Sequence, residues 1–187
     1  MKEIIVKDLM VPLEEYATIN EDATLYDAVI ELEKAQAEYE KSHKTYRHRA
    51  VLVYNKSGKI VGKLSQLDLL RSLEPKYNQA AAESGRMMAS GFSRNFLRSL
   101  LQQFSLWDKP LADICKKAAH HLVKNHMYIP EEGEFVDADD SLDVAINQLV
   151  LGHHQSLLVV RNKQIVGILR LTDVFREVAN TIKACEI

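Results

Sequence analysis

Two kinds of apolar pattern occur along this chain, and each occurs twice. Amphipathic helices are indicated where apolar residues recur at intervals of three and four. These positions are Leu25, Ala28, Val29 and Leu32 in the first half and Leu142, Ala145, Ile146 and Leu149 in the second. Short, mainly apolar runs follow each helix, and their length and composition predict pairs of buried strands at 50–54 with 60–64 and at 156–160 with 165–169.

The two halves of the chain repeat one another in order and spacing. Gly62 and Gly167 lie in matching Ile-Val-Gly segments at an offset of 105 residues, and an aspartate follows each glycine by six positions, as Asp68 and Asp173. The preceding helices are offset by 117 residues, so the first half is about 12 residues longer between its helix and its hairpin. Such internal similarity predicts two copies of one structural unit.

Each copy predicts the order short helix, β, α, β, β, α. The lead-in segments 6–10 and 111–115 also correspond, and Thr24 and Ser141 stand where helix N-caps are expected. A three-stranded sheet with helices on one face leaves its other face uncovered. We therefore expect an α/β fold, α+β-like in its connections, in which the two sheets pack on each other with pseudo-twofold symmetry and two related clefts.

In the order and spacing of these pieces the chain resembles a tandem pair of CBS domains, the modules named after cystathionine β-synthase. The most specific element is hydrophobic-Val-Gly-x-hydrophobic-[Ser/Thr]-x-x-Asp at the start of the last helix of each half. The resemblance implies two βαββα repeats packed sheet to sheet, with residues 1–73 as the first repeat, 74–109 as a helical insertion and 110–187 as the second repeat. It also implies a regulatory module that binds adenine nucleotides and often forms dimers.

The same resemblance implies a set of nucleotide-binding residues. One ionised carboxylate can accept both hydroxyls of a ribose, and a hydroxyl at a helix start suits ribose or phosphate oxygens. Ser65 and Asp68 fill these roles in the first half, whereas Arg170 precedes Asp173 in the second. Arginine at this position would either clamp a phosphate or close the cleft. Strand and hairpin positions complete the implied set: Thr18, Ile19, Ala50, Val136 and Ser156.

Each cleft is expected, by the resemblance, to join the aspartate of one repeat to the opposite repeat. Asp68 would face residues 135–136 and 155–156, and Asp173 would face residues 16–19 and 49–50. A purely structural interpretation also stands, because Ser-x-x-Asp at a helix start is a capping box. The glycines before it have a structural alternative too, since they allow close packing of strands.

Composition narrows the range of partners. The chain has 24 Lys and Arg against 26 Asp and Glu, for a net charge of −2, so no overall basic field attracts nucleic acid or an anionic membrane. Two cysteines without C-x-x-C spacing predict reduced thiols rather than a disulfide framework. No apolar run reaches the roughly 20 residues of a membrane helix, and the first residues do not resemble a signal peptide, so we expect a cytoplasmic protein.

Several other features have a structural and a functional interpretation. The basic run 41–49 is either a solvated extension of the first helix and its exit loop or a positive rim beside the Asp173 cleft, which would favour a triphosphate or dinucleotide over a monophosphate. The adjacent histidines at 120–121 and 153–154 point to different sides of an element, so a metal site is not expected. Cys115 lies in an apolar stripe and is expected in the core. No catalytic pattern is present, which predicts a non-enzymatic protein.

The insertion predicts a helix with an apolar stripe formed by Leu97, Leu100, Leu101 and Phe104. It would pack on its own lobes, form a dimer contact, or act as an output element that exposes residues 80–105 to a protein partner. The predicted function is a homodimeric sensor of AMP, ADP or ATP, with S-adenosylmethionine and NAD as further candidates and no catalytic cofactor. The alternatives are a dimerisation scaffold with unoccupied clefts and a small enzyme that acts on a nucleotide.

Overall fold

The computed structural model describes residues 4–41, 48–77 and 93–184, and their strands form two sheets. In the first sheet, β2 (Thr18–Asn20) runs parallel to β3 (Ala50–Tyr54), which pairs antiparallel with β4 (Ile60–Ser65). The second sheet has the order β1-β7-β6-β5, formed by β1 (Val11–Pro12), β5 (Phe135–Asp137), β6 (Ser156–Arg161) and β7 (Gln164–Arg170). Both predicted hairpins are confirmed.

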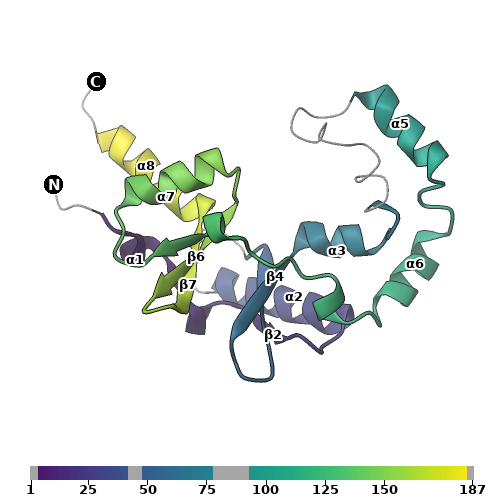
Figure 1. Cartoon of the computed structure of the whole chain (residues 1–187), viewed down its shortest axis with the longest axis horizontal. Coiled ribbons are helices and arrows are strands. Elements are labelled where there is room, and N and C mark those ends of the chain that lie inside the picture. Colours follow the sequence, from purple (N-terminus) through teal and green to yellow (C-terminus); the bar gives the residue numbers. More distant parts are fainter. Residues whose placement is uncertain (1–3, 42–47, 78–92, 185–187) are drawn as a thin grey trace.

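Two longer helices accompany each sheet (Figure 1). They are α2 (Leu25–Lys41) and α3 (Gln66–Ser72) in the first half, and α7 (Leu142–Leu151) and α8 (Leu171–Ala184) in the second. The predicted cap of α2 is confirmed, because the Asp27 N–H donates to Thr24 Oγ1 at 3.2 Å. Ser141 is the N-cap residue of α7, as predicted, but its side chain does not cap the helix. Ser141 makes no side-chain hydrogen bond to the helix, and the Leu142 N–H at its start donates to the carbonyl of Ile4 instead.

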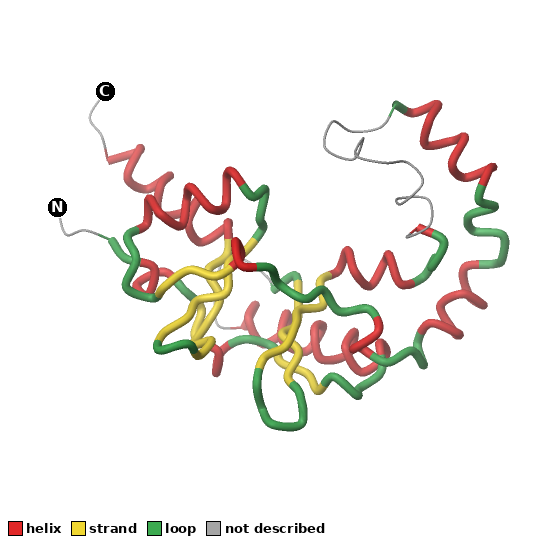
Figure 2. Tube along the Cα trace, viewed as in Figure 1, coloured by secondary structure: helices red, strands yellow, loops and turns green. Residues whose placement is uncertain are grey.

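The sheets pack face to face, as the repeat predicts. A cluster of buried side chains joins them, with Leu52 from β3 against Leu158 and Ile168 from β6 and β7, and with Val11 and Tyr16 beside them. Figure 2 shows the two groups of strands meeting at the middle of the molecule. Each half keeps a separate core on the other face of its sheet, beneath its own helices. The pseudo-twofold arrangement of the fold is therefore confirmed.

The predicted correspondence of 6–10 with 111–115 is wrong, because residues 111–115 lie in α6 (Leu111–Ala118) and do not contribute to the described cores. The lead-in of the second half is instead the segment that contains Val123, and the two lead-in segments are exchanged between the halves. Val6 of α1 (Val6–Leu9) is fully buried in the core of the second half, and β1 pairs with β7. Conversely, Val123 of the 3-10 turn η3 (Val123–Asn125) is fully buried in the core of the first half. Figure 1 accordingly places the N-terminal end beside the lobe that carries α7 and α8. Each lobe therefore needs a segment that lies far away in the sequence.

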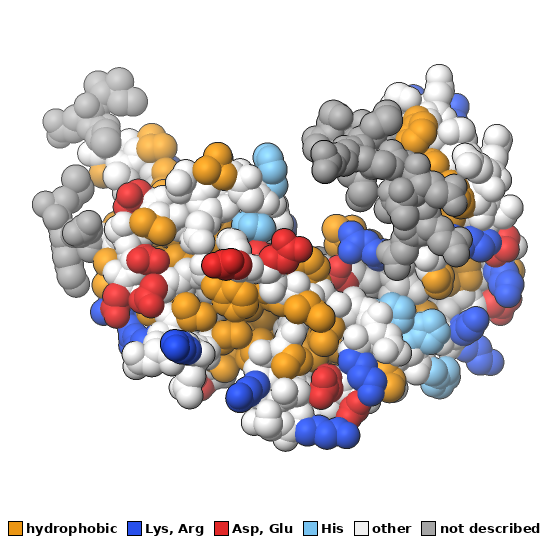
Figure 3. All heavy atoms as spheres, viewed as in Figure 1, with side chains coloured by type: hydrophobic (Ala, Val, Ile, Leu, Met, Phe, Trp, Pro, Cys, Tyr) orange, Lys and Arg blue, Asp and Glu red, His pale blue; other side chains and the backbone are white. Residues whose placement is uncertain are grey.

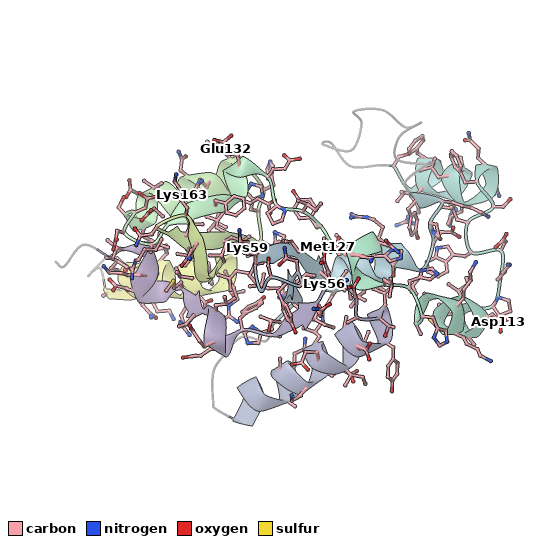
Figure 4. The ribbon with its side chains drawn as sticks, turned by 60° about the horizontal axis from the view of Figure 1, so that its bottom comes forward. Lys56, Lys59, Asp113, Met127, Glu132 and Lys163 are labelled. Carbon is pink, nitrogen blue, oxygen red and sulfur yellow. The ribbon has the colours of Figure 1, made fainter. Side chains whose placement is uncertain are left out.

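The glycine of each Val-Gly motif makes room for the exchanged segment. A Cβ atom on Gly167 would lie 2.5 Å from the carbonyl oxygen of Val11. A Cβ atom on Gly62 would lie 2.7 Å from the sulfur of Met127 and 3.0 Å from the carbonyl oxygen of Tyr128. Met127 is labelled in Figure 4, where it lies over the first half. Close packing of strands, one of the two interpretations of these glycines, is thus observed.

The described part of the insertion extends away from both lobes. Its helix α5 (Arg94–Gln103) has no buried residue, and Leu97 and Leu101 are 47% and 44% exposed. Figure 4 shows Asp113 of the next helix, α6 (Leu111–Ala118), far from the sheets. At the base of the insertion, the backbone N–H of Trp107 donates to Glu74 Oε2 at 2.8 Å. The indole N–H of Trp107 donates to the Tyr77 hydroxyl, also at 2.8 Å.

The helical stripe of the insertion is confirmed in α5, whereas its expected start at 79–83 lies outside the described residues. Cys115 is exposed on α6, so the prediction that it is a core residue is wrong, because α6 turns its surface to solvent rather than to a lobe. Cys185 lies outside the described residues. Across residues 4–41, 48–77 and 93–184, no helix has the length and apolar character that crossing a bilayer requires.

Candidate functional site

A cleft of about 630 Å³ lies where the two halves meet. The start of α3 and the neighbouring ends of β3 and β4 form its first-half wall, with Arg49, Ala50, Lys63, Ser65, Asp68 and Arg71 among the lining residues. The second-half wall includes Tyr128, Glu134 of the turn η4 (Glu132–Glu134), residues 153–156, Arg170 and Thr172. In Figure 3 the surface is hollowed above α3, beside the lobe that carries α7.

Strand register explains why these residues meet. Ala50 pairs with Ser65 in the first hairpin, and Ser156 pairs with Arg170 in the second. These are equivalent positions of the two repeats, and all four line the same cleft. Residues expected in both predicted clefts therefore line this one cleft.

Ser65 and Asp68 form a complete capping box at the start of α3. The backbone N–H and hydroxyl of Ser65 donate to Asp68 Oδ2 at 2.9 and 2.6 Å, and the Asp68 N–H donates back to Ser65 Oγ at 3.2 Å. Arg71 donates to the other carboxylate oxygen, Oδ1, at 3.2 Å. The structural interpretation of this motif is thus correct, and the same carboxylate also lines the cleft.

The second half has a different arrangement at the equivalent position. Arg170 donates from Nε and Nη2 to the two carboxylate oxygens of Asp173, at 2.5 and 2.8 Å. Asp173 is only 2% exposed and is not among the residues that line the cleft, whereas Arg170 is. Tyr16 packs nearby, and burial raises the pKa of its phenol well above the ordinary value. Asp173 therefore lies behind Arg170 rather than at the surface of the cleft.

A buried ion pair joins the two walls of the cleft. Lys63 Nζ lies 2.6 Å from Glu134 Oε1, and the two side chains are 15% and 3% exposed. A hydrogen bond to Glu134 raises the pKa of Tyr128 to about 12. Burial raises the pKa of Glu134, but hydrogen bonds from Lys63 and Tyr128 outweigh this and leave it below its usual value of 4.5. The pair thus places one positive and one negative charge where the two walls of the cleft meet.

The predicted site residues divide into two groups. Those that line the cleft are Ser65, Asp68, Ala50, Ser156 and Arg170. Those that do not are Thr18, Ile19, Val136 and Asp173. Ile19 and Val136 point into the cores of their own halves, because alternate residues of a strand face opposite sides of the sheet. Of the two segments expected opposite Asp68, Gln155 and Ser156 line the same cleft, whereas residues 135–136 are not among its lining residues.

Sequence analysis missed Lys63, Tyr128 and Glu134. Lys63 and Tyr128 exchange backbone hydrogen bonds because the lead-in of the second repeat runs beside β4. The signal available in the sequence was the glycine at position 62, next to Lys63, which marks the close approach of a second backbone.

The basic run is only partly described, since residues 42–47 lie outside the described residues. Arg49 is exposed and lines the cleft, as a positive rim requires. The rim was expected beside Asp173, whereas the cleft that Arg49 lines is the one that Asp68 also lines. His48 is 2% exposed and packs edge-on against Tyr16, with ring centroids 4.4 Å apart, so it is not part of a solvated extension.

The two histidine pairs differ in how their members are placed. His121 forms a hydrogen bond with His126 at 3.1 Å, whereas His120 is exposed. His153 and His154 both line the cleft. Within the described residues, no group of three or more His, Cys, Asp or Glu side chains is placed to hold a metal ion.

Comparison with known proteins agrees with this architecture. The family model for the CBS domain matches residues 6–75 and 116–180. One similar solved structure is the CBS domain of a CBS domain-containing membrane protein from Sphaerobacter thermophilus, with 19% identity, a TM-score of 0.56, and coverage of 94% of this chain and 88% of that chain. A CBS domain-containing protein of unknown function from Bacillus anthracis has 17% identity, a TM-score of 0.59, and coverage of 95% and 94%.

A third similar structure is CBSX2 in complex with AMP, with 19% identity, a TM-score of 0.54, and coverage of 96% of this chain and 98% of that chain. At these identities the similar structures show the fold alone. No curated protein matches the chain. The family model, however, matches well over half of the sequence, in the two regions that the internal repeat marks. This chain belongs to the CBS-domain family and carries the domain twice.

Proposed function

We propose that this CBS pair is a regulatory module that binds an adenosine-containing nucleotide in the cleft between its halves. One observation carries the proposal: the Asp68 carboxylate lines the cleft at the start of α3, and hairpin residues of the other repeat line the same cleft. A carboxylate can accept both hydroxyls of a ribose, and each charge-assisted bond contributes roughly 1.5–3 kcal/mol. CBSX2, which is similar in fold, is a complex with AMP.

The capping box leaves room for this role. A carboxylate offers about four lone-pair positions, and Ser65 occupies two of them on Oδ2. Oδ1 accepts from Arg71, whose side chain is 47% exposed. A ribose would bind at Oδ1, and Arg71 would then be available to a phosphate oxygen. Asp68 would thus cap its helix and hold the sugar at the same time.

The charges of the cleft favour an anionic ligand. Arg49, Lys63, Arg71 and Arg170 line it, against the two carboxylates of Asp68 and Glu134. Charged groups in a concave site concentrate ions of opposite sign. We therefore propose AMP, ADP or ATP as the ligand, with S-adenosylmethionine and NAD as weaker candidates. In this proposal the protein acts by binding alone, without a catalytic cofactor.

The regulatory signal would arise because the ligand binds one relative arrangement of the two halves better than another. A ligand that contacts both halves shifts their equilibrium only as far as it binds one arrangement better than another. We propose that a homodimer, working in the cytoplasm, passes this change to a protein partner through residues 80–105. Of this range the structure describes 93–105, where α5 exposes Leu97 and Leu101. Neither nucleic acid nor a membrane is part of the proposal.

One observation favours a second candidate, a dimerisation scaffold with an empty cleft. Asp68 and Asp173 both bind groups within their own helix starts, so neither needs a ligand to satisfy its carboxylate. Calorimetric titration of the full chain with AMP separates the two candidates. Saturable binding supports the sensor, and the absence of heat with AMP, ADP and ATP supports the scaffold.

Replacement of Asp68 by alanine tests the site directly. We expect Asp68→Ala to weaken AMP binding about tenfold to a hundredfold, because roughly 1.5–3 kcal/mol of charge-assisted bonding to the ribose is lost. The variant also loses a helix cap, so a matched control is needed. Asp27 forms the same capping box with Thr24 at the start of α2 and does not line the cleft.

Asp27→Ala should therefore lower the thermal stability of the protein and leave its affinity for AMP unchanged. Equal AMP affinities for Asp68→Ala, Asp27→Ala and the unchanged protein would reject Asp68 as the ribose acceptor and leave it the capping role alone.

A further inference from the structure

The two repeats have lost their equivalence at one position. Ser65 and Arg170 occupy the same place in their repeats, at the end of the second hairpin strand and opposite Ala50 and Ser156. Both line the cleft. The serine binds its aspartate through a small hydroxyl, so that the Asp68 carboxylate reaches the cleft, whereas the arginine places a whole guanidinium in front of Asp173.

This contact occupies both carboxylate oxygens of Asp173. Its two oxygens accept from Nε and Nη2 of Arg170, and Arg176 adds a second cation at 3.7 Å from Oδ1. The side chain of Asp173 is 2% exposed. A ribose could reach this carboxylate only by displacing a buried bidentate ion pair, and breaking such a pair is strongly unfavourable. The second repeat therefore offers no open sugar acceptor.

Arg170, in contrast, is presented to the ligand. It lines the cleft together with Asp68 and Arg49, and its bidentate bond to Asp173 fixes the plane of its guanidinium. A guanidinium is planar and matches the geometry of phosphate oxygens, so an arginine that lines the cleft suits the phosphate of a ligand. An arginine held in one orientation also loses less side-chain entropy on binding than a mobile one.

The size of the cleft fits one ligand. Its volume of about 630 Å³ is within the range of about 300–1,000 Å³ that a single small-molecule site has. The residues equivalent by symmetry share this one cleft, so a second nucleotide would have to occupy the same space. A ribose at Asp68 would leave the phosphate to lie toward the cations of the middle and the far wall.

We propose that the cleft binds one nucleotide per chain, with its ribose at Asp68 and its phosphate at Arg170, which Asp173 holds in position. This inference rests on the proposed nucleotide-binding function and adds stoichiometry and orientation to it. In these terms Arg170 is a binding residue and Asp173 is a positioning residue.

Calorimetric titration of the full chain with AMP and with adenosine tests the inference. We expect one AMP per chain, and an affinity for AMP at least tenfold higher than that for adenosine. Arg170→Met should lower the AMP affinity about tenfold and leave the adenosine affinity unchanged. Arg161→Met, which changes an exposed arginine of β6 outside the cleft, should alter neither affinity.

Asp173→Asn separates positioning from general stability. An amide cannot hold a guanidinium through two acceptor oxygens, so the ratio of AMP to adenosine affinity should fall, which a merely structural role for Asp173 would not cause.

Two AMP molecules per unchanged chain, or an unchanged affinity ratio in Arg170→Met, would overturn the inference while leaving the proposed function intact. Both of these measurements can be made even if the Asp173 variant does not fold. Absence of binding by AMP, ADP, ATP and adenosine alike would overturn the proposed function itself, and the inference with it.

Discussion

At the scale of single residues, one substitution between repeats changes the environment of an aspartate. Asp68 and Asp173 follow their glycines at the same distance, yet Asp68 lines the cleft and Asp173 lies behind Arg170. The repeated motif correctly predicted that both aspartates lie at the start of a helix that follows a hairpin. Which oxygens remain available could not be predicted from the sequence, since this depends on the side-chain conformation of a long, flexible arginine.

The ion pair of Lys63 and Glu134 predicts a pH dependence of stability. The pKa of Glu134 is lower in the folded protein than its usual 4.5, so the folded state binds its proton less readily than the unfolded state does. Its contribution is fully present above about pH 4.5 and is lost as the pH falls through the lowered pKa. Glu134→Gln should reduce the free energy of unfolding at neutral pH by about 1–3 kcal/mol.

Urea unfolding of both proteins between neutral and acidic pH measures this effect, and the difference between them should shrink on acidification. Asp139→Asn is the matched control, because Asp139 also pairs with a lysine, Lys7, but is 59% exposed. Its effect should be small and weakened by salt. A Glu134→Gln deficit that stays constant across the acid range would contradict the assigned role of the Lys63–Glu134 pair.

At the scale of elements, the exchange of lead-in segments explains both what was predicted and what was missed. Periodicity located the hairpins and helices because these are set by local sequence patterns. The meeting of Lys63 with Tyr128 and Glu134 joins positions more than 60 residues apart, and no local pattern encodes such a pairing. Likewise, the exposed position of Cys115 follows from the direction of α6, which its apolar stripe alone does not determine.

The contact between β1 and β7 predicts a strong effect of a single methyl group. Gly167→Ala would place a Cβ atom 2.5 Å from the backbone oxygen of Val11, so β1 must move away from its neighbour. We expect a loss of about 1–3 kcal/mol in the free energy of unfolding, the usual cost of overpacking. Chemical denaturation measures it, and hydrogen exchange at Ile168 should accelerate.

Gly62→Ala should cost less, because its nearest obstacle is the flexible side chain of Met127. Gly133→Ala is the neutral control, since its Cβ would have its nearest neighbour at 3.9 Å, an ordinary contact. Equal stabilities for the three alanine variants would show that β1 does not require the glycine.

At the scale of the whole molecule, the exchange predicts that the two lobes unfold together. Val6 completes the core of the second half and Val123 that of the first, and both are fully buried. Val6→Ala and Val123→Ala should each lower the stability of the entire pair by about 2 kcal/mol, because buried methyl groups are lost. Val150→Ala, at a position that is 61% exposed, should have little effect.

Scanning calorimetry provides the test. We expect one transition in each variant, with a calorimetric enthalpy equal to the van't Hoff enthalpy. Two resolved transitions, with Val6→Ala moving one of them and Val123→Ala the other, would mean that the lobes are independent despite their shared segments.

The exchanged lead-ins also bear on how the chain is made. A ribosome releases the first hairpin long before it reaches the segment around Tyr128 that borders β4. At about 5–20 residues per second, the interval between residues 65 and 128 lasts roughly 3–13 s. During that time the nascent first lobe lacks a piece of its core and must be kept from premature partners. The N-terminal segment must wait longer still, until translation has delivered the strand on which it finally rests.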